Sequence, residues 1–282
     1  MNALLLAVAI TTAGPASTQA NGSSTITELP DVVDIAADWA SGTRWAGVAD
    51  FASSWKGSLF GIGSALLLIA LGSAAASRRD MIPGRMQNAA ELVVEKLQEF
   101  LEEILGEHAS EHIHFLGTLF LYILFMNLSG LVPLLKAPTS ILETTAALAI
   151  VAFVYVQVWG IRYRGLVGYL YHAAGSPSSP SDWMMLPLML PIHVVSELAR
   201  PLSLAGRLFG NIMGEDTLIA VFTGLGAAVV ASILPVGIPF ALPLVLLAIL
   251  LSTVQALVFA LLTTLYIAQV LPEEHSSRPV AA

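Results

Sequence analysis

An arginine inside a long apolar tract is the feature that most restricts what this chain can fold into. The tract runs from about Leu186 to Leu234 and contains LARPLSLAGRLFGN, in which Arg200 and Arg207 lie a heptad apart. Placing an arginine at the centre of a bilayer costs at least about 3 kcal/mol. Because guanidinium stays charged in proteins, Arg207 requires a counter-charge.

The composition is that of a membrane protein. Of the 282 residues, 56% are hydrophobic and 11% are charged, whereas a soluble domain has about 25% charged residues. Cysteine is absent, which excludes disulfide and thiol chemistry. The net charge is −8, and the sequence has no cluster of basic residues that could bind nucleic acid. The sequence has no Walker or G-x-S-x-G motif, and His108 and His112 do not form HExxH, so we expect no cofactor and no metal.

Five apolar segments are long enough to cross a bilayer, which takes about 20 helical residues. They are residues 59–76, 115–135, 141–161, 186–234 and 239–271. Residues 86–110 alternate apolar and acidic side chains at helical spacing, which predicts an amphipathic helix at the membrane interface. Residues 175–182, GSPSSPSD, are expected to form a loop.

The domain organisation follows from these segments. Residues 59–272 form the membrane domain, 21–58 an extracytoplasmic segment and 273–282 a cytoplasmic tail. Residues 1–20 resemble an export signal that lacks a basic start, so both a cleaved and a retained N-terminus fit the sequence. Five crossings with the C-terminus in the cytoplasm place seven basic residues inside and three outside, and the positive-inside rule favours this orientation.

The last two apolar tracts are longer than an upright helix needs. Residues 192–233 would extend roughly 63 Å as a helix, against a hydrocarbon layer about 30 Å thick. Such a helix has to tilt or to break, and Pro201 is a possible kink. We therefore predict an all-α integral membrane protein with about five transmembrane helices, of which the last two form a long, strongly tilted hairpin.

Polar residues form a stripe along the fourth tract. At 100° per residue they fall within a band about 80° wide: His193, Glu197, Arg200, Arg207, Asn211 and Glu215. Glu197 and Arg200 are three residues apart and are expected to neutralise each other. Arg207 has no acid three or four residues away, so its counter-charge must come from another helix or another protein.

Polar residues also lie within the second and fifth spans. Ser252, Gln255, Tyr266 and Gln269 share one face of the last helix. Gln255 either faces Arg207 across an aqueous crevice or is an interhelical hydrogen-bonding group. Asn127, in FMNLSGLVP, is a third intramembrane polar group, for which a structural role and a functional role fit the sequence equally well.

Three of these segments together resemble a known family. SELARPLSLAGRLFGNIMGEDTL, LFLYILFMNLSGLVPLL and TVQALVFALLTTLYIA are similar to the motifs of subunit a of the F-type ATP synthase, the stator channel beside the rotating c-ring. The resemblance covers about residues 78–274, and its R-L-F-G-N core is highly specific. It implies a proton channel with two offset half-channels that couples proton flow to rotation of the c-ring.

The resemblance assigns roles to residues of this sequence. Arg207 matches the essential stator cation that faces the rotor carboxylate. The residues that match the proton path are Asn127, Ser203, Asn211, Glu215, Asp216 and Gln255. Ala248 stands where some members have a histidine, and His193 stands where many have a glutamate, which leaves Glu197 as the nearby cytoplasm-side acid. Either Glu215 or Asp216 fits the acid that relays protons from outside.

The resemblance also implies partners, a location and a lack of catalysis by this chain alone. The partners would be the c-ring, b-type peripheral stalk subunits, lipid and, indirectly, the soluble ATPase sector, in a bacterial inner membrane. One alternative is a secondary transporter whose arginine binds an anionic substrate, which predicts matching interrupted helices in two halves of the chain. Another is an intramembrane hydrolase, for which only His193 is a plausible base.

Overall fold

The computed structural model describes five main stretches of the chain. They are residues 54–76, 84–132, 135–173, 180–232 and 242–271, with a few single positions between 32 and 51. The expected signal segment 1–20, most of the segment 21–58 and the tail 273–282 lie outside the described residues.

The regular elements of the described stretches are all helices. Two are short 3-10 turns, η1 (Gly106–His108) and η2 (Pro138–Ser140), and the others are α4 (Lys56–Ala76), α5 (Arg85–Leu105), α6 (Ala109–Ser129), α7 (Leu142–Ala173), α8 (Pro180–Ser232) and α9 (Leu242–Val270). This confirms the all-α class.

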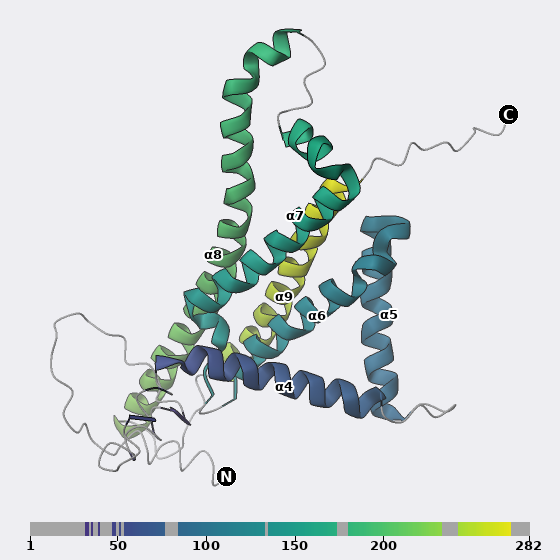
Figure 1. Cartoon of the computed structure of the whole chain (residues 1–282). Helices are drawn as coiled ribbons and strands as arrows, with labels where there is room; N and C mark the ends of the chain where they lie inside the picture. Colours follow the sequence, from purple (N-terminus) through teal and green to yellow (C-terminus); the bar gives the residue numbers. More distant parts are fainter. Residues whose placement is uncertain are drawn as a thin grey trace.

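The helices pack as one bundle in which several of them are inclined to one another (Figure 1). α6, α7 and α9 lie side by side, α8 packs along α7 and α9, α5 contacts α6 and α9, and α4 crosses α6. The central core joins α6, α7, α8 and α9 through fully buried side chains such as Ile123, Leu208 and Phe259. A second core, at the end of the bundle where α5 and α6 meet, includes Leu101, Leu116 and Ile267.

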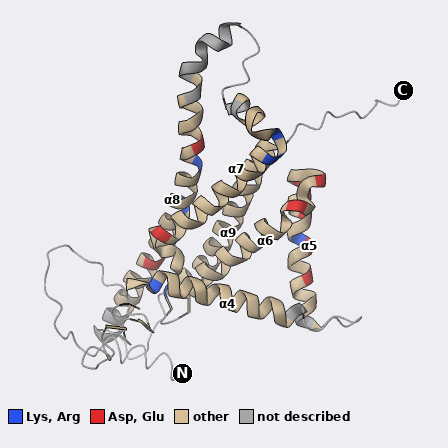
Figure 2. Ribbon diagram, in the orientation of Figure 1, with Lys and Arg blue, Asp and Glu red and all other residues tan. Residues whose placement is uncertain are grey.

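Length and composition identify the membrane-crossing helices. Four described ranges are long and apolar enough to span a bilayer: Lys56–Ala74, Gln87–Ser129, Leu142–Tyr169 and Leu242–Val270. The chain is therefore a multi-pass membrane protein. The fourth predicted span, α8, is not among them, in keeping with the charged residues that it carries, whereas α9 has none (Figure 2).

Several helix ends differ from those expected. α5 stops at Leu105 because Gly106 adopts φ 58°, and α6 then begins at Ala109, ahead of the expected Phe115. α8 begins at Pro180, which is a favourable first helical residue, so Pro180–Asp182 belong to the helix and not to the expected loop. α8 is a continuous helix of 53 residues through Pro201, roughly 80 Å long.

α7 extends beyond the expected end at Ile161 and folds back on itself. Gly165 has φ 69° and ψ 162°, a conformation almost restricted to glycine, and the helix changes direction there. Arg164, just before the reversal, donates hydrogen bonds to the last carbonyls of α9, those of Gln269, Val270 and Leu271, at 3.2–3.3 Å. These bonds satisfy the C-terminal carbonyls of α9.

The reversal at Gly165 predicts a position-specific cost. Gly165→Ala should destabilise the protein by about 1–3 kcal/mol, because alanine strongly disfavours this backbone conformation. Gly168→Ala is the matched control, since an added Cβ there meets only ordinary contacts. Thermal unfolding in detergent should show a lower Tm for Gly165→Ala alone, and equal Tm values for the two variants would contradict the assignment.

Candidate functional site

Arg207 lies on an open face of α8. Its side chain is exposed, although its neighbour Leu208 is fully buried in the central core. Within the described part of the chain, Arg207 makes no hydrogen bond and no ion pair. The sequence predicted that its counter-charge is not on its own helix, and none of the described helices supplies one.

Small residues surround Arg207 on this open face. Gly206, Gly210 and Gly214 each have open space where a Cβ would be built, with no atom within 4 Å. Ser203, one turn before Arg207, is also exposed. Small residues let another helix approach closely, so this face of α8 has the shape of a docking surface for a helix.

The polar stripe of α8 divides between a buried edge and an open edge. Glu197 and Glu215 lie on the edge that turns toward the bundle, and Glu215 is only 9% exposed. Arg207 lies on the opposite edge of the same band. The stripe is therefore not a single polar surface, because packing against α9 takes up one edge and leaves the other free.

Arg200 is neutralised locally, as predicted. Its Nη1 lies 3.1 Å from Glu197 Oε1, and its guanidinium stacks over the ring of Tyr266 at 4.9 Å. His193 Nε2 lies 3.7 Å from the same carboxylate oxygen. Glu197 and Arg200 also line a small cavity of about 10 Å³ between α7, α8 and α9, which has room for one water at most.

Gln255 contacts Asn211 instead of Arg207. Asn211 Nδ2 donates to Gln255 Oε1 at 2.8 Å, so Gln255 acts as an interhelical hydrogen-bonding group between α8 and α9. Its Nε2 atom is buried and has no hydrogen-bond partner among the described residues. That Gln255 faces Arg207 across an aqueous crevice stays a prediction.

Asn127 joins α6, η2 and α9. Its Nδ2 donates to the Ser252 carbonyl at 3.3 Å, and its Oδ1 accepts from Thr139 Oγ1 at 2.8 Å. Asn127, Thr139 and Ser252 are all buried. Since one amide atom donates and the other accepts, these two bonds fix the orientation of the Asn127 amide.

Glu215 lies next to this polar cluster. Ser252 Oγ donates to Glu215 Oε1 at 3.5 Å, a weak bond, and Glu215 Oε2 is buried with no hydrogen-bond partner among the described residues. Asp216 is half-buried and has interactions of its own. Ala248, where a histidine partner for this acid would be expected, is buried on α9.

The two histidines with metal-like spacing belong to an aromatic cluster. His112 is fully buried between the hydroxyls of Tyr155 and Tyr163, at 2.9 and 3.2 Å. Tyr163 donates to Glu111 at 2.7 Å, and His108 Nδ1 lies 4.0 Å from the same carboxylate group. In the described ranges no group of three metal-binding side chains includes them.

A larger hollow lies between α4, α6 and α7. It has a volume of about 280 Å³, and its polar lining comes from Ser58, Tyr122, Glu143 and Thr144. Gly61 brings α4 close enough for its carbonyl to accept a hydrogen bond from Tyr122 at 3.2 Å. The hollow is adjacent to η2, since Pro138 also packs near Gly61.

Sequence reasoning missed some residues of these clusters. Glu143 and Gln157 are polar residues within an apolar span, and that placement was a usable signal. Thr139 and Tyr169 carried no such signal, because a threonine after a proline and a tyrosine near a helix end are common in membrane proteins. Only the tertiary contacts bring these two residues to the site.

Comparison with known proteins decides the family. A sequence profile of the family described as ATP synthase A chain matches residues 58–268. The chain belongs to the ATP synthase A chain family. The match contains Arg207 and the polar clusters around it, and membership makes the chain a membrane-sector subunit of an ATP synthase.

Several curated members of the ATP synthase A chain family align with most of this chain. ATP synthase subunit a of Protochlamydia amoebophila (strain UWE25) is 44% identical over 208 residues, 74% of this chain and 76% of that protein. That of Solidesulfovibrio magneticus is 44% identical over 164 residues, 58% of this chain and 66% of that protein. ATP synthase subunit a 2 of Syntrophotalea carbinolica is 36% identical over 209 residues, 74% of this chain and 82% of that protein.

The hydrogen bond between Thr139 and the Asn127 amide gives a testable prediction. Thr139→Val removes the donor to Asn127 Oδ1 at nearly constant volume, which should cost about 1–3 kcal/mol because the buried oxygen loses its hydrogen bond. Thr139→Ser keeps the hydroxyl and should lose less. Thermal unfolding of the purified complex measures both, and equal losses would show that the hydroxyl plays no part.

Proposed function

We propose that this chain is the proton-channel stator of its ATP synthase, with Arg207 as the cation that faces rotor carboxylates one after another. The observation that carries the proposal is the exposed Arg207, which has no partner among the described residues and lies on a face of α8 lined by Ser203, Gly206, Gly210 and Gly214. A buried or lipid-facing guanidinium needs an anion. A neighbouring helix that carries a carboxylate would fit the open space beside the glycines and would supply the anion that Arg207 needs.

The physical role of Arg207 follows from its permanent charge. A carboxylate that moves past Arg207 is stabilised in its deprotonated form, because a nearby opposite charge favours ionisation. Away from Arg207 the same carboxylate faces lipid, where the charged form has a high free energy and the protonated form is strongly favoured. Rotation therefore requires a proton to be added on one side of Arg207 and removed on the other, and the cation also repels protons that would pass directly.

The inlet side of the path lies around Glu215. Glu215, Ser252, Asn127 and Gln255 converge between α6, α8 and α9. Glu215 Oε2 and Gln255 Nε2 are buried without a partner among the described residues, and buried polar atoms of this kind are places for water. We assign the relay to Glu215, because Glu215 contacts this cluster through Ser252. The hollow beside Glu143 lies near the starts of α4 and α7, next to η2, and would admit water.

The outlet side lies around Glu197. His193 and Glu197 precede Arg207 on α8 by more than two helical turns. Glu197 lines the small cavity together with Arg200 and Tyr266. Ser203 continues this direction along the open face. A proton released near Arg207 would pass to these groups and leave on the side where α7 and α9 end.

The basic residues set the direction of the path across the membrane. The cytoplasmic side would hold α5, the end of α7 and the C-terminus, so protons enter from outside through the Glu215 cluster. Each proton that crosses 100 mV supplies about 2.3 kcal/mol. The c-ring and b-type stalk subunits would be the membrane partners, in a bacterial inner membrane, with the soluble ATPase sector as the site of ATP synthesis.

The transporter alternative has less support. It requires helices interrupted at matching places in two halves of the chain, whereas the reversal at Gly165 in α7 has no counterpart in α8 or α9 over their described residues.

Replacement of Arg207 tests the proposal. Arg207→Ala should abolish ATP-driven proton pumping in inverted membrane vesicles while the complex remains assembled, because the rotor carboxylate loses its counter-charge. Arg207→Lys should also fail, since an ammonium can lose its proton and lacks the planar fork. Normal coupled pumping by either variant would refute the assigned role.

The control for this experiment is Arg162→Ala. Arg162 stacks on Trp159 at 5.0 Å near the end of α7, away from the open face of α8. Its replacement removes the same charge and should leave pumping within about twofold of wild type, an effect of less than about 0.5 kcal/mol.

A further inference from the structure

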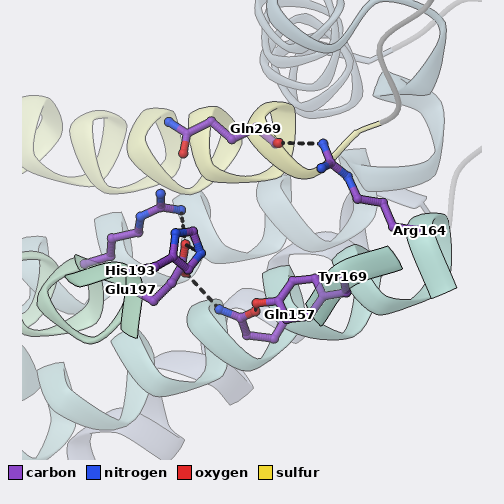
Figure 3. A network of polar contacts seen from close by, with 7 residues as sticks. Gln157, Arg164, Tyr169, His193, Glu197 and Gln269 are labelled. Atoms are coloured by element: carbon purple, nitrogen blue, oxygen red, sulfur yellow. Dashed lines mark hydrogen bonds and ion pairs between the residues drawn. The ribbon is translucent and has the colours of Figure 1, made fainter. Parts of the chain in front are cut away.

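Both carboxylate oxygens of Glu197 are held by other side chains. Oε1 lies 3.1 Å from Arg200 Nη1 and 3.7 Å from His193 Nε2, all on α8. Oε2 accepts a hydrogen bond from Gln157 Nε2 on α7 at 3.0 Å. Gln157 is therefore the group that links this acid to a second helix (Figure 3).

Gln157 is held in turn by Tyr169. The Tyr169 hydroxyl donates to Gln157 Oε1, so the chain of donors runs from Tyr169 through the Gln157 amide to Glu197 (Figure 3). Because the carbonyl end of the amide is occupied by Tyr169, its NH₂ end points to the carboxylate. Hydrogen bonds that share one amide reinforce each other.

The backbone reversal of α7 delivers Tyr169 to this place. Gly165 turns the chain back, and the ring of Tyr169 then packs on Gly160, where an added Cβ would lie 3.1 Å from Tyr169 Cε2. Arg164 fastens the reversal to the end of α9. The ring is therefore placed by packing, and its hydroxyl is the part that reaches Gln157.

We propose that Tyr169 and Gln157 are positioning residues for proton release through Glu197. They orient the carboxylate toward the small cavity and favour its charged form by hydrogen bonding. When Glu197 takes up a proton, rotation of the Gln157 amide lets Oε1 accept from the Glu197 O–H and lets the NH₂ group donate to the Tyr169 oxygen. The pair therefore keeps hydrogen bonds in both protonation states, and the bond to the charged carboxylate is the stronger one. This inference rests on the proposed function, in which Glu197 belongs to the outlet.

The test is the pH dependence of passive proton conductance in membranes stripped of the soluble ATPase sector. Charged and titratable groups around Glu197 are His193 and Arg200 on α8, Tyr169 on α7 and Tyr266 on α9. Gln157→Leu should move the half-maximal pH upward, because the hydrogen bond to the charged carboxylate is lost. Tyr169→Phe keeps the ring against Gly160 and should cause a smaller upward shift.

The double variant separates positioning from packing. Gln157→Leu with Tyr169→Phe should match Gln157→Leu alone, because Tyr169 acts through Gln157. Tyr163→Phe is the control, since it removes a tyrosine hydroxyl of α7 that bonds to Glu111 instead; it should cause no shift. Additive shifts, an equal shift in the control, or no shift in Gln157→Leu would each overturn the inference.

Failure of this inference differs from failure of the proposed function. If Arg207→Ala abolishes coupled pumping while the Gln157 and Tyr169 variants keep the wild-type pH profile, the stator role stands and the positioning role is rejected. If Arg207→Ala pumps normally, the stator role itself is rejected.

Discussion

The exposed guanidinium of Arg207 is the charge on which the rest of the arrangement depends. It lies on a helix whose opposite edge is packed into the bundle, and no described residue neutralises it. A cation at membrane depth is stable only beside an anion. The small residues around Arg207 leave the space in which that anion, carried by another helix, can approach. Under the proposed function, the charge of Arg207 is balanced only in the assembled complex.

The bundle separates two polar regions on either side of this charge. Around Glu215, side chains from α6, α8 and α9 meet, and around Glu197, side chains from α7, α8 and α9 meet. Between them the core is apolar, with Leu204, Leu208 and Ile212 buried on α8. Under the proposed function, this apolar barrier between two polar regions would keep protons from crossing the subunit alone. Passage would then require a carrier that moves past Arg207, which is the coupling that an ATP synthase needs.

Much of this could be predicted from the sequence, because the strongest signals were local. Apolar length and helical period placed the five long helices, and the spacing of Glu197 and Arg200 predicted their ion pair, which the structure confirms. Tertiary contacts were out of reach: nothing in the sequence indicated that Gln255 bonds to Asn211, or that Thr139 fixes Asn127. The reversal at Gly165 was also missed, since a glycine directly after the polar run Arg162–Arg164 resembles an ordinary helix end.

The central claim is that a carboxylate-bearing helix of the rotor lies against the open face of α8 beside Arg207. This chain has no cysteine, so a cysteine at Gly210, where the space is open, can be paired with one beside the rotor carboxylate in the assembled complex. Oxidation should give a disulfide between the two subunits from Gly210→Cys, and none from Gly72→Cys on α4. Absence of the Gly210 cross-link, or equal cross-linking from Gly72, would contradict the account.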